Sequence, residues 1–179
     1  MNENASLFFV DRHVDSHIKE KKAFIEYGSN QKFITYTDLH EQSSKLRHFF
    51  SKFKINREDR VIILMQDVIS YPIIFWGCLK SGVVPVLLNT LLSSEVVNDI
   101  INNSRAKAVF ISSGLLSSFE NSVKKNVNIK HIIEVGTKKS NYINFEEEIQ
   151  KCSFQDTIKC SKDEIAFWLY SSGSTGQPK

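Results

Sequence analysis

The sequence predicts an α/β fold, a doubly wound and mostly parallel sheet preceded by an N-terminal β-hairpin. Between residues 61 and 135, short β-branched apolar runs alternate with helical patterns, as in sheets whose strands are covered by crossover helices. Upstream, a polar turn separates two short β-favouring runs. The composition, 41% hydrophobic and 24% charged over 179 residues, is that of one globular domain with its own core.

The hairpin is predicted from Ala23–Tyr27 and Phe33–Tyr36, with Gly28–Gln31 as its turn. Thr37–Asp38 is a helix-start signal. The helix that follows places its apolar side chains on one face, because they recur at helical spacing: Leu39, Leu46, Phe49, Phe50 and Phe53.

The first strand–helix–strand unit begins at Val61–Met65, a continuous apolar run that predicts a strand buried on both faces. A buried helix follows at Ser70–Ser81 and stops at Gly82. Gly77 lowers the intrinsic stability of that helix, so we expect close packing against a neighbour there. The next strand, Val83–Leu88, contains Pro85, which removes a backbone donor and predicts an edge strand or a bulge.

The remaining elements repeat this alternation and then weaken. From Gly136 to Asp163 the pattern is poor, with one short helix expected. The predicted elements are a helix at Ser94–Ser104, a strand at Ala108–Ser112, a helix marked by Leu115, Leu116, Phe119 and Val123, a strand at His131–Val135, a short helix at Phe145–Ile149 and a strand at Ile165–Tyr170.

Composition excludes several classes of function. Three cysteines without a Cys-x-x-Cys pair argue against a disulfide framework or a zinc site and favour reduced thiols in the cytoplasm. A net charge of +3 is too weak to indicate nucleic-acid binding. The apolar stretch Val68–Leu92 is interrupted by Lys80, Ser81 and Gly82, which favours buried core elements over a membrane span.

The segment SSGSTGQPK at residues 171–179 has the composition of a phosphate-binding loop. Glycines let backbone N–H groups approach an anion, hydroxyls donate to phosphate oxygens, and a lysine adds positive charge. The spacing fits neither the Walker A pattern nor the dinucleotide fingerprint. A Ser/Gly loop without a ligand has the same composition, so composition alone leaves both interpretations open.

The longer segment FWLYSSGSTGQPK resembles the phosphate-binding signature of the adenylate-forming acyl-CoA synthetase superfamily, and it is most similar to the benzoate–CoA ligase (aryl acid) branch. Further stretches resemble the N-terminal part of those ligases in the same order: FFVDRHV at 8–14, RVIILMQD at 60–67, KSGVVPVLLNTLL at 80–92 and NSRAKAVFIS at 103–112. The resemblance covers nearly the whole chain and is weakest from Gly136 to Ser161.

The resemblance implies a ligase that activates a carboxylic acid with ATP and Mg²⁺, giving an acyl-adenylate and pyrophosphate, after which a thiol, usually coenzyme A, displaces AMP. It implies that the loop holds the β- and γ-phosphates. No catalytic residue and no metal ligand is predicted within this chain. The predicted phosphate-binding residues are Ser171, Ser172, Gly173, Ser174, Thr175, Gly176 and Lys179.

The resemblance also implies that residues 1–179 are the N-terminal portion of a large adenylation domain. In the family, the segments that bind adenine, ribose, the acid and magnesium follow the signature, as does a small C-terminal domain. We therefore expect no adenylation by this chain unaided. The identity of the acid, expected to be aromatic, and the oligomeric state stay open.

Two other interpretations are kept. One is a non-catalytic α/β phosphate-loop module or degenerate remnant, which the coding sequence after codon 179 would distinguish from a ligase. The other is an adenylation domain that loads a carrier-protein thiol. His13 and His17, four residues apart, are interpreted as surface histidines, and Trp76 and Trp168 as packing residues.

Overall fold

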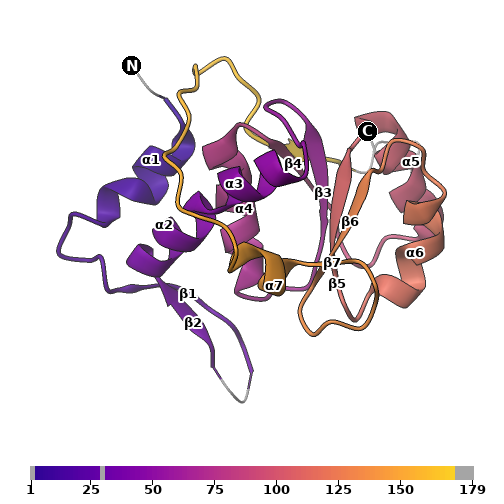
Figure 1. Cartoon of the computed structure of the whole chain (residues 1–179), viewed down its shortest axis with the longest axis horizontal. Helices are drawn as coiled ribbons and strands as arrows, with labels where there is room; N and C mark the ends of the chain where they lie inside the picture. The colour runs from indigo at the N-terminus through magenta and orange to yellow at the C-terminus, as the bar shows by residue number, and fades with distance from the viewer. Residues whose placement is uncertain (1–2, 29–30, 172–179) are drawn as a thin grey trace.

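The computed structural model describes residues 3–28 and 31–171 and has three layers, helices on either side of a central sheet (Figure 1). The sheet has the strand order β7-β6-β5-β3-β4-β8, and all of its pairs are parallel. The predicted α/β fold is confirmed. The sheet strands are β3 Arg60–Leu64, β4 Val84–Leu87, β5 Ala108–Ser112, β6 His131–Val135, β7 Ile143–Asn144 and β8 Trp168–Leu169.

The helices divide between the two faces of the sheet, with α2, α3, α4 and α7 on one and α5 and α6 on the other (Figure 1). The short elements α1, η1 and β7 were not predicted, because a few residues carry too little periodicity. None of the helices in the described ranges is long and apolar enough to cross a bilayer. The helices are α1 Ala5–Phe9, the 3₁₀ helix η1 Asp11–His13, α2 Tyr36–Ser44, α3 Leu46–Lys52, α4 Ser70–Ser81, α5 Ser94–Ser104, α6 Leu116–Lys124 and α7 Phe145–Ile149.

Two hydrophobic cores result from the alternation of side chains along the buried strands. Ile63 and Phe110 face α2, α3, α4 and α7, where Phe110 packs against Phe49 with ring centroids 5.9 Å apart. Ile62 and Val109, their neighbours in sequence, face α5 and α6. Because successive residues of a strand point to opposite faces, each strand serves both cores.

The N-terminal hairpin pairs β1 Lys22–Ile25 with β2 Phe33–Thr35 in antiparallel fashion, as predicted. Of its turn, Ser29 and Asn30 lie outside the described residues. The hairpin is joined to the sheet layer by Glu26, whose Oε2 accepts from the N–H of Ile69, the cap residue of α4, at 3.1 Å. A carboxylate at that place stabilises the positive end of the helix dipole.

The predicted helix after the hairpin is two helices. Thr35 and Asp38 form a reciprocal capping box at the start of α2, so the cap lies two residues before the predicted Thr37. At Lys45 the backbone N–H bonds back to the carbonyls of Gln42 and Ser43, which tightens the chain and separates α2 from α3.

Helix α4 has the predicted bounds. Pro72 lies in its first turn, and Gly82 ends it in the left-handed conformation at φ 67°. Gly77 permits a close approach of α3, since a Cβ at this position would lie 2.4 Å from Cγ of Leu46. Cys78 is fully buried, and burial raises the pKa of its thiol well above the ordinary value.

The prediction that Pro85 places β4 at an edge or on a bulge is wrong, because β4 lies between β3 and β8 in regular register. The N–H groups of Val84 and Leu88 bond to the β3 side. Alternation along the strand therefore turns the nitrogen of Pro85 toward β8. Pairing with β8 begins one residue later, at Val86 with Trp168, because Pro85 has no N–H to donate. Strand β8 has two residues instead of the predicted Ile165–Tyr170.

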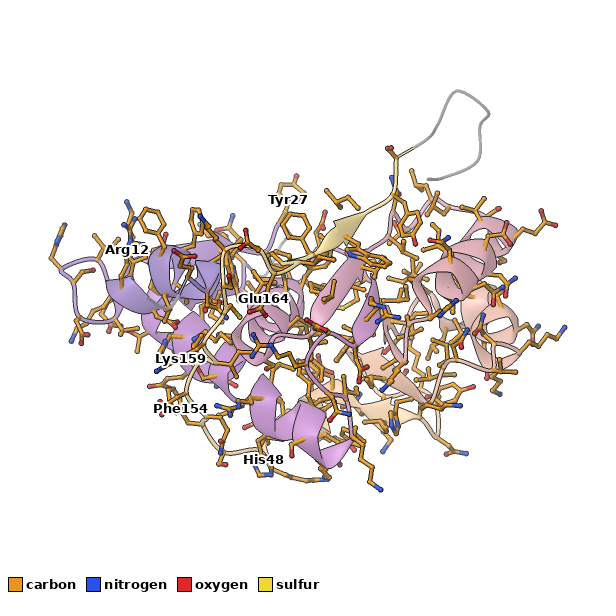
Figure 2. The ribbon with its side chains drawn as sticks, turned by 90° about the horizontal axis from the view of Figure 1, so that it is seen from above. Arg12, Tyr27, His48, Phe154, Lys159 and Glu164 are labelled. Atoms are coloured by element: carbon orange, nitrogen blue, oxygen red, sulfur yellow. The ribbon has the colours of Figure 1, made fainter. Side chains whose placement is uncertain are left out.

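Residues 153–165, called the strap here, run from α7 back over α2, α3 and α4 to β8 (Figure 1). Figure 2 follows the strap through Phe154, Lys159 and Glu164. Its backbone is bonded to the helices by Gln155 N–H to the Ser44 carbonyl at 3.2 Å and by Ile158 N–H to the Lys80 carbonyl at 2.9 Å.

A buried charged cluster lies where the strap crosses the helices. The Lys80 ammonium, 1% exposed, lies 2.6 Å from Oδ1 of Asp11 and donates to Oγ of Ser44 at 2.8 Å. The same carboxylate lies 2.9 Å from Nδ1 of His40 and accepts from the strap hydroxyl of Thr157 at 2.9 Å. The cluster thus joins η1, α2, α4 and the strap.

Burial and pairing act in opposite directions on these two charges. Burial alone would raise the pKa of Asp11, but the hydrogen bonds from His40 and Lys80 hold it below the ordinary value. Burial lowers the pKa of Lys80, and Asp11 offsets part of that effect. Because the folded-state pKa of Asp11 is depressed, its stabilising contribution is present above the unfolded-state pKa and is lost as the pH falls through the folded-state value.

We expect Asp11→Asn to lower the free energy of unfolding by about 3 kcal/mol, because it leaves Lys80 buried without a counter-ion. Urea denaturation at neutral pH measures this. Asp15→Asn, at an exposed carboxylate, is the matched control. The double variant Asp11→Asn/Lys80→Met should recover most of the lost free energy of unfolding. When the pH falls below about 4, the free energy of unfolding should decrease less in Asp11→Asn than in the parent. Equal stability of Asp11→Asn and the parent at neutral pH would contradict the role of the pair.

We expect Gly77→Ala to destabilise the protein by about 2 kcal/mol despite the better helix propensity of alanine, because the new methyl group overlaps Leu46. Gly114→Ala is the control, since a Cβ there would meet only the Gln66 side chain at 3.7 Å. Thermal unfolding measures both. In a double-mutant cycle, Gly77→Ala should destabilise the protein less when Leu46→Ala is also present, because the methyl group then has room. Additive effects of the two substitutions would show that the methyl group does not overlap Leu46.

Candidate phosphate-binding site

Strand β8 leads to Ser171, the first residue of the predicted loop, at the carboxyl edge of the sheet. Val86 pairs with Trp168 and Leu87 with Leu169 in parallel register, so Ser171 follows β8 on the edge where β3 and β4 also end. In parallel α/β sheets, ligands bind at this edge. Ser171 is exposed. The other predicted loop residues lie outside the described residues: Ser172, Gly173, Ser174, Thr175, Gly176 and Lys179.

The residue that leads into the loop is anchored on α5. The Tyr170 hydroxyl donates to Oδ1 of Asn103 at 2.6 Å, and burial raises the pKa of the phenol. Trp168, two residues before Tyr170 and on the same face of the strand, packs into the core beside α5. Its ring centroid lies 5.8 Å from Cζ of Arg60. These contacts fix the direction in which the chain leaves the sheet, and they agree with the interpretation of Trp168 as a packing residue.

Polar residues at the ends of other strands lie on the same edge, and their side chains bond to backbone groups there. The Ser112 hydroxyl accepts from the Gln66 N–H at 2.9 Å, and the Ser113 hydroxyl donates to the Val135 carbonyl at 3.0 Å. Oδ1 of Asn89 accepts from the N–H of Leu91 at 2.9 Å, which makes the segment after β4 a local turn. These bonds support the edge itself.

An apolar cavity of about 470 Å³ lies beside the carboxyl ends of β3 and β4, between the hairpin and α4. Trp76 is half-buried and contributes to its wall, in addition to the packing role predicted for it. The sequence did not indicate this cavity, because its walls come from segments about 40 residues apart and its aromatic residues have the same pattern as core residues. Its lining is Phe24, Ile25, Glu26, Asp67, Val68, Ile69, Tyr71, Pro72, Phe75, Trp76 and Leu87.

The arginines in the first half of the chain have structural partners. Arg47 Nη1 donates to the Asp156 carbonyl at 2.9 Å, Arg57 pairs with Glu164 of the strap with Nε 3.1 Å from Oε2, and Arg60 Nε donates to the Ser104 carbonyl at 2.7 Å. His13 ends η1 and His17 lies beyond it, so the two do not share a helix. Within residues 3–28 and 31–171 no group of three metal-ligating side chains comes together.

A family model described as AMP-binding enzyme matches residues 10–179, which include the whole predicted loop. The chain belongs to the AMP-binding enzyme family. Among curated AMP-binding enzymes, the 4-hydroxybenzoate–CoA/benzoate–CoA ligase of Rhodopseudomonas palustris is 32% identical over 98% of this chain and 32% of its own length. The benzoate–CoA ligase of Thauera aromatica is 33% identical over 68% of this chain and 23% of its own length.

Solved structures of AMP-binding enzymes confirm the fold. An anthranilate CoA ligase bound to anthranoyl-AMP has a TM-score of 0.90 at 21% identity, covering 99% of this chain and 34% of that one. A benzoate CoA ligase from Burkholderia xenovorans LB400 has a TM-score of 0.82 at 27% identity, covering 100% of this chain and 33% of that one. This chain therefore spans about a third or less of the length of these relatives.

Proposed function

We propose that residues 1–179 form the N-terminal portion of the large adenylation domain of an AMP-forming acid–thiol ligase, and that the loop holds the phosphates of ATP. The observation that carries the proposal is β8, which ends at the carboxyl edge of a parallel sheet immediately before the loop, within the range that the family model matches. The proposed phosphate-binding residues are Ser171, Ser172, Gly173, Ser174, Thr175, Gly176 and Lys179.

In the proposed reaction, a carboxylate oxygen of the acid attacks the α-phosphorus of ATP and pyrophosphate leaves. Negative charge grows on the bridging oxygen of the departing group, where backbone N–H groups of Gly173 and Gly176 and the Lys179 ammonium stabilise it. Mg²⁺, which the family resemblance implies, would supply further neutralisation of the phosphates. The sulfur of coenzyme A then attacks the acyl carbon, and AMP leaves.

The proposed acid is aromatic and resembles benzoate. Two relatives at 32% and 33% identity are named as benzoate ligases, whereas relatives named for long-chain fatty acids and acetate are 26% and 29% identical. The proposal further includes coenzyme A as the acceptor and a cytoplasmic location, because three cysteines without a Cys-x-x-Cys pair favour reduced thiols.

We expect the 179-residue chain to bind ATP more tightly than ADP and to bind AMP least, because the loop grips the terminal phosphates. Lys179→Ala should weaken ATP binding about tenfold, the loss of one charge-assisted contact, and Gly173→Val should weaken it by obstructing the backbone. Isothermal titration with MgATP measures this, with Lys125→Ala as the control for overall charge. Equal affinity for AMP and ATP would place the triphosphate elsewhere.

We expect no ATP–pyrophosphate exchange from residues 1–179 alone. A ligase that contains these residues together with the remaining family regions should catalyse exchange with benzoates and more slowly with cinnamate or a fatty acid. Exchange of labelled pyrophosphate into ATP is the measurement, and CoA consumption distinguishes a CoA ligase from a domain that loads a carrier protein. A preference for aliphatic acids would overturn the benzoate assignment.

A further inference from the structure

A basic cavity, called the lysine cavity here, lies at the amino edge of the sheet, opposite the edge where Ser171 lies. It has a volume of about 480 Å³ and is formed where α3 ends and where β5 and β6 begin. Because β5 and β6 have five residues each, about 15 Å of sheet separates the two edges. Four lysines from three segments of the chain contribute to its wall: Lys52, Lys54, Lys107 and Lys130.

The positive charges of the lysine cavity are only partly neutralised. Oδ2 of Asp59 lies 2.8 Å from Nζ of Lys107, and Glu148 pairs with Lys52. Glu148 is shared, because Lys151 is its second partner. Within residues 3–28 and 31–171, no acidic side chain belongs to the cavity wall itself. The excess of positive charge in a concave surface raises the local concentration of anions.

Two of the four lysines have no carboxylate partner in the described part of the chain. Nζ of Lys130 donates to the Val127 carbonyl at 2.8 Å, which leaves further N–H donors of this ammonium available. The exposed Lys54 ammonium makes no hydrogen bond or ion pair with the described residues. Lys54 and Lys130 are therefore the groups that can bind an anion without first breaking an ion pair.

The backbone of Lys54 has a conformation that favours glycine. The N–H of Lys54 donates to the Ser51 carbonyl at 3.1 Å and the N–H of Ile55 donates to the Phe50 carbonyl at 2.9 Å, the Schellman ending of a helix. This ending holds Lys54 in the left-handed region at φ 53°. Helix termination alone would be served better by glycine, whereas strained side chains occur at ligand-binding sites.

Apolar and aromatic side chains complete the wall of the lysine cavity. Phe53 is half-buried, and its ring centroid lies 5.4 Å from that of His131. Ile55, which is 4% exposed, also belongs to the wall. An apolar wall combined with a few charged donors is typical of pockets for organic ligands. A bare inorganic anion would leave this apolar wall in contact with water.

We propose that the lysine cavity binds a soluble organic molecule that carries at least two phosphate groups on a flat apolar body. The phosphates contact the ammonium groups of Lys54 and Lys130, and the body lies against Phe53 and His131. Lys52 and Lys107 add positive charge beside the phosphates. The inference is independent of the proposed ligase activity, since the lysine cavity and the carboxyl edge of the sheet are at opposite ends of the strands.

Nuclear magnetic resonance of the isotope-labelled 179-residue chain tests the proposal, at about 0.15 M salt so that distant charges are screened. The probes are ADP, inorganic pyrophosphate and adenosine. ADP should shift the amide signals of Lys54, Ile55 and His131 and bind there about fivefold more tightly than pyrophosphate, because its base covers apolar surface. Adenosine should bind at least about tenfold more weakly than ADP. Lys179→Ala should leave these shifts unchanged, which separates this site from the proposed phosphate-binding loop.

Lys54→Gly should weaken ADP binding at these residues about tenfold, through the loss of one charge-assisted contact. The same substitution should keep or raise the thermal stability, because glycine relieves the left-handed backbone, so unfolding cannot explain the weaker binding. Arg105→Gly is the matched control. Arg105 is exposed and has a left-handed φ of 51°, but it does not belong to the cavity wall. Its substitution should change the affinity by less than about twofold.

Four results would overturn the proposal. They are the absence of ADP-induced shifts at Lys54, Ile55 and His131, equal affinities of ADP and adenosine there, equal affinities of ADP and pyrophosphate, and equal effects of Lys54→Gly and Arg105→Gly. Tighter binding of a short single-stranded RNA than of ADP at the same residues would also overturn it, since the cavity would then belong to a nucleic-acid interface.

Discussion

The ion pair between Lys80 and Asp11 is the interaction on which the positions of the later elements depend. An ammonium group removed from water costs several kcal/mol unless a counter-charge and hydrogen bonds surround it. Asp11, Ser44 and His40 supply those partners from η1 and α2. The Thr157 hydroxyl adds the strap to the same carboxylate, so one buried charge organises four segments that are distant in sequence.

From that cluster the strap leads to β8, and β8 leads to the loop. The Arg57–Glu164 pair holds the far end of the strap against the turn before β3. Trp168 and Tyr170 then lock the chain against α5 by packing and by the bond to Asn103. The position of Ser171 at the sheet edge is thus determined by a polar anchor at the amino end of the strap and by the aromatic anchor of Trp168 and Tyr170.

Local signals in the sequence predicted the elements that local chemistry controls. Gly82 predicted the end of α4 correctly, and the apolar runs predicted the positions of β5 and β6. The partner of Lys80 could not be predicted, because Asp11 lies 69 residues away and no spacing rule relates them. The predicted strand Ile165–Tyr170 was longer than the observed β8. The sequence does not show toward which neighbouring strand the nitrogen of Pro85 points, so the bond lost from β8 could not be predicted. For the site, composition and motif predict the loop, whereas the cavity beside α4 is found only from tertiary structure.

The missing backbone donor of Pro85 has a thermodynamic consequence for the loop. Only two residues of β8 pair with β4, whereas five residues pair between β5 and β6. Detaching β8 from β4 therefore breaks few hydrogen bonds, and such segments open at a lower free energy than the sheet interior. Ser171 therefore follows a part of the sheet that opens more readily than the central strands do.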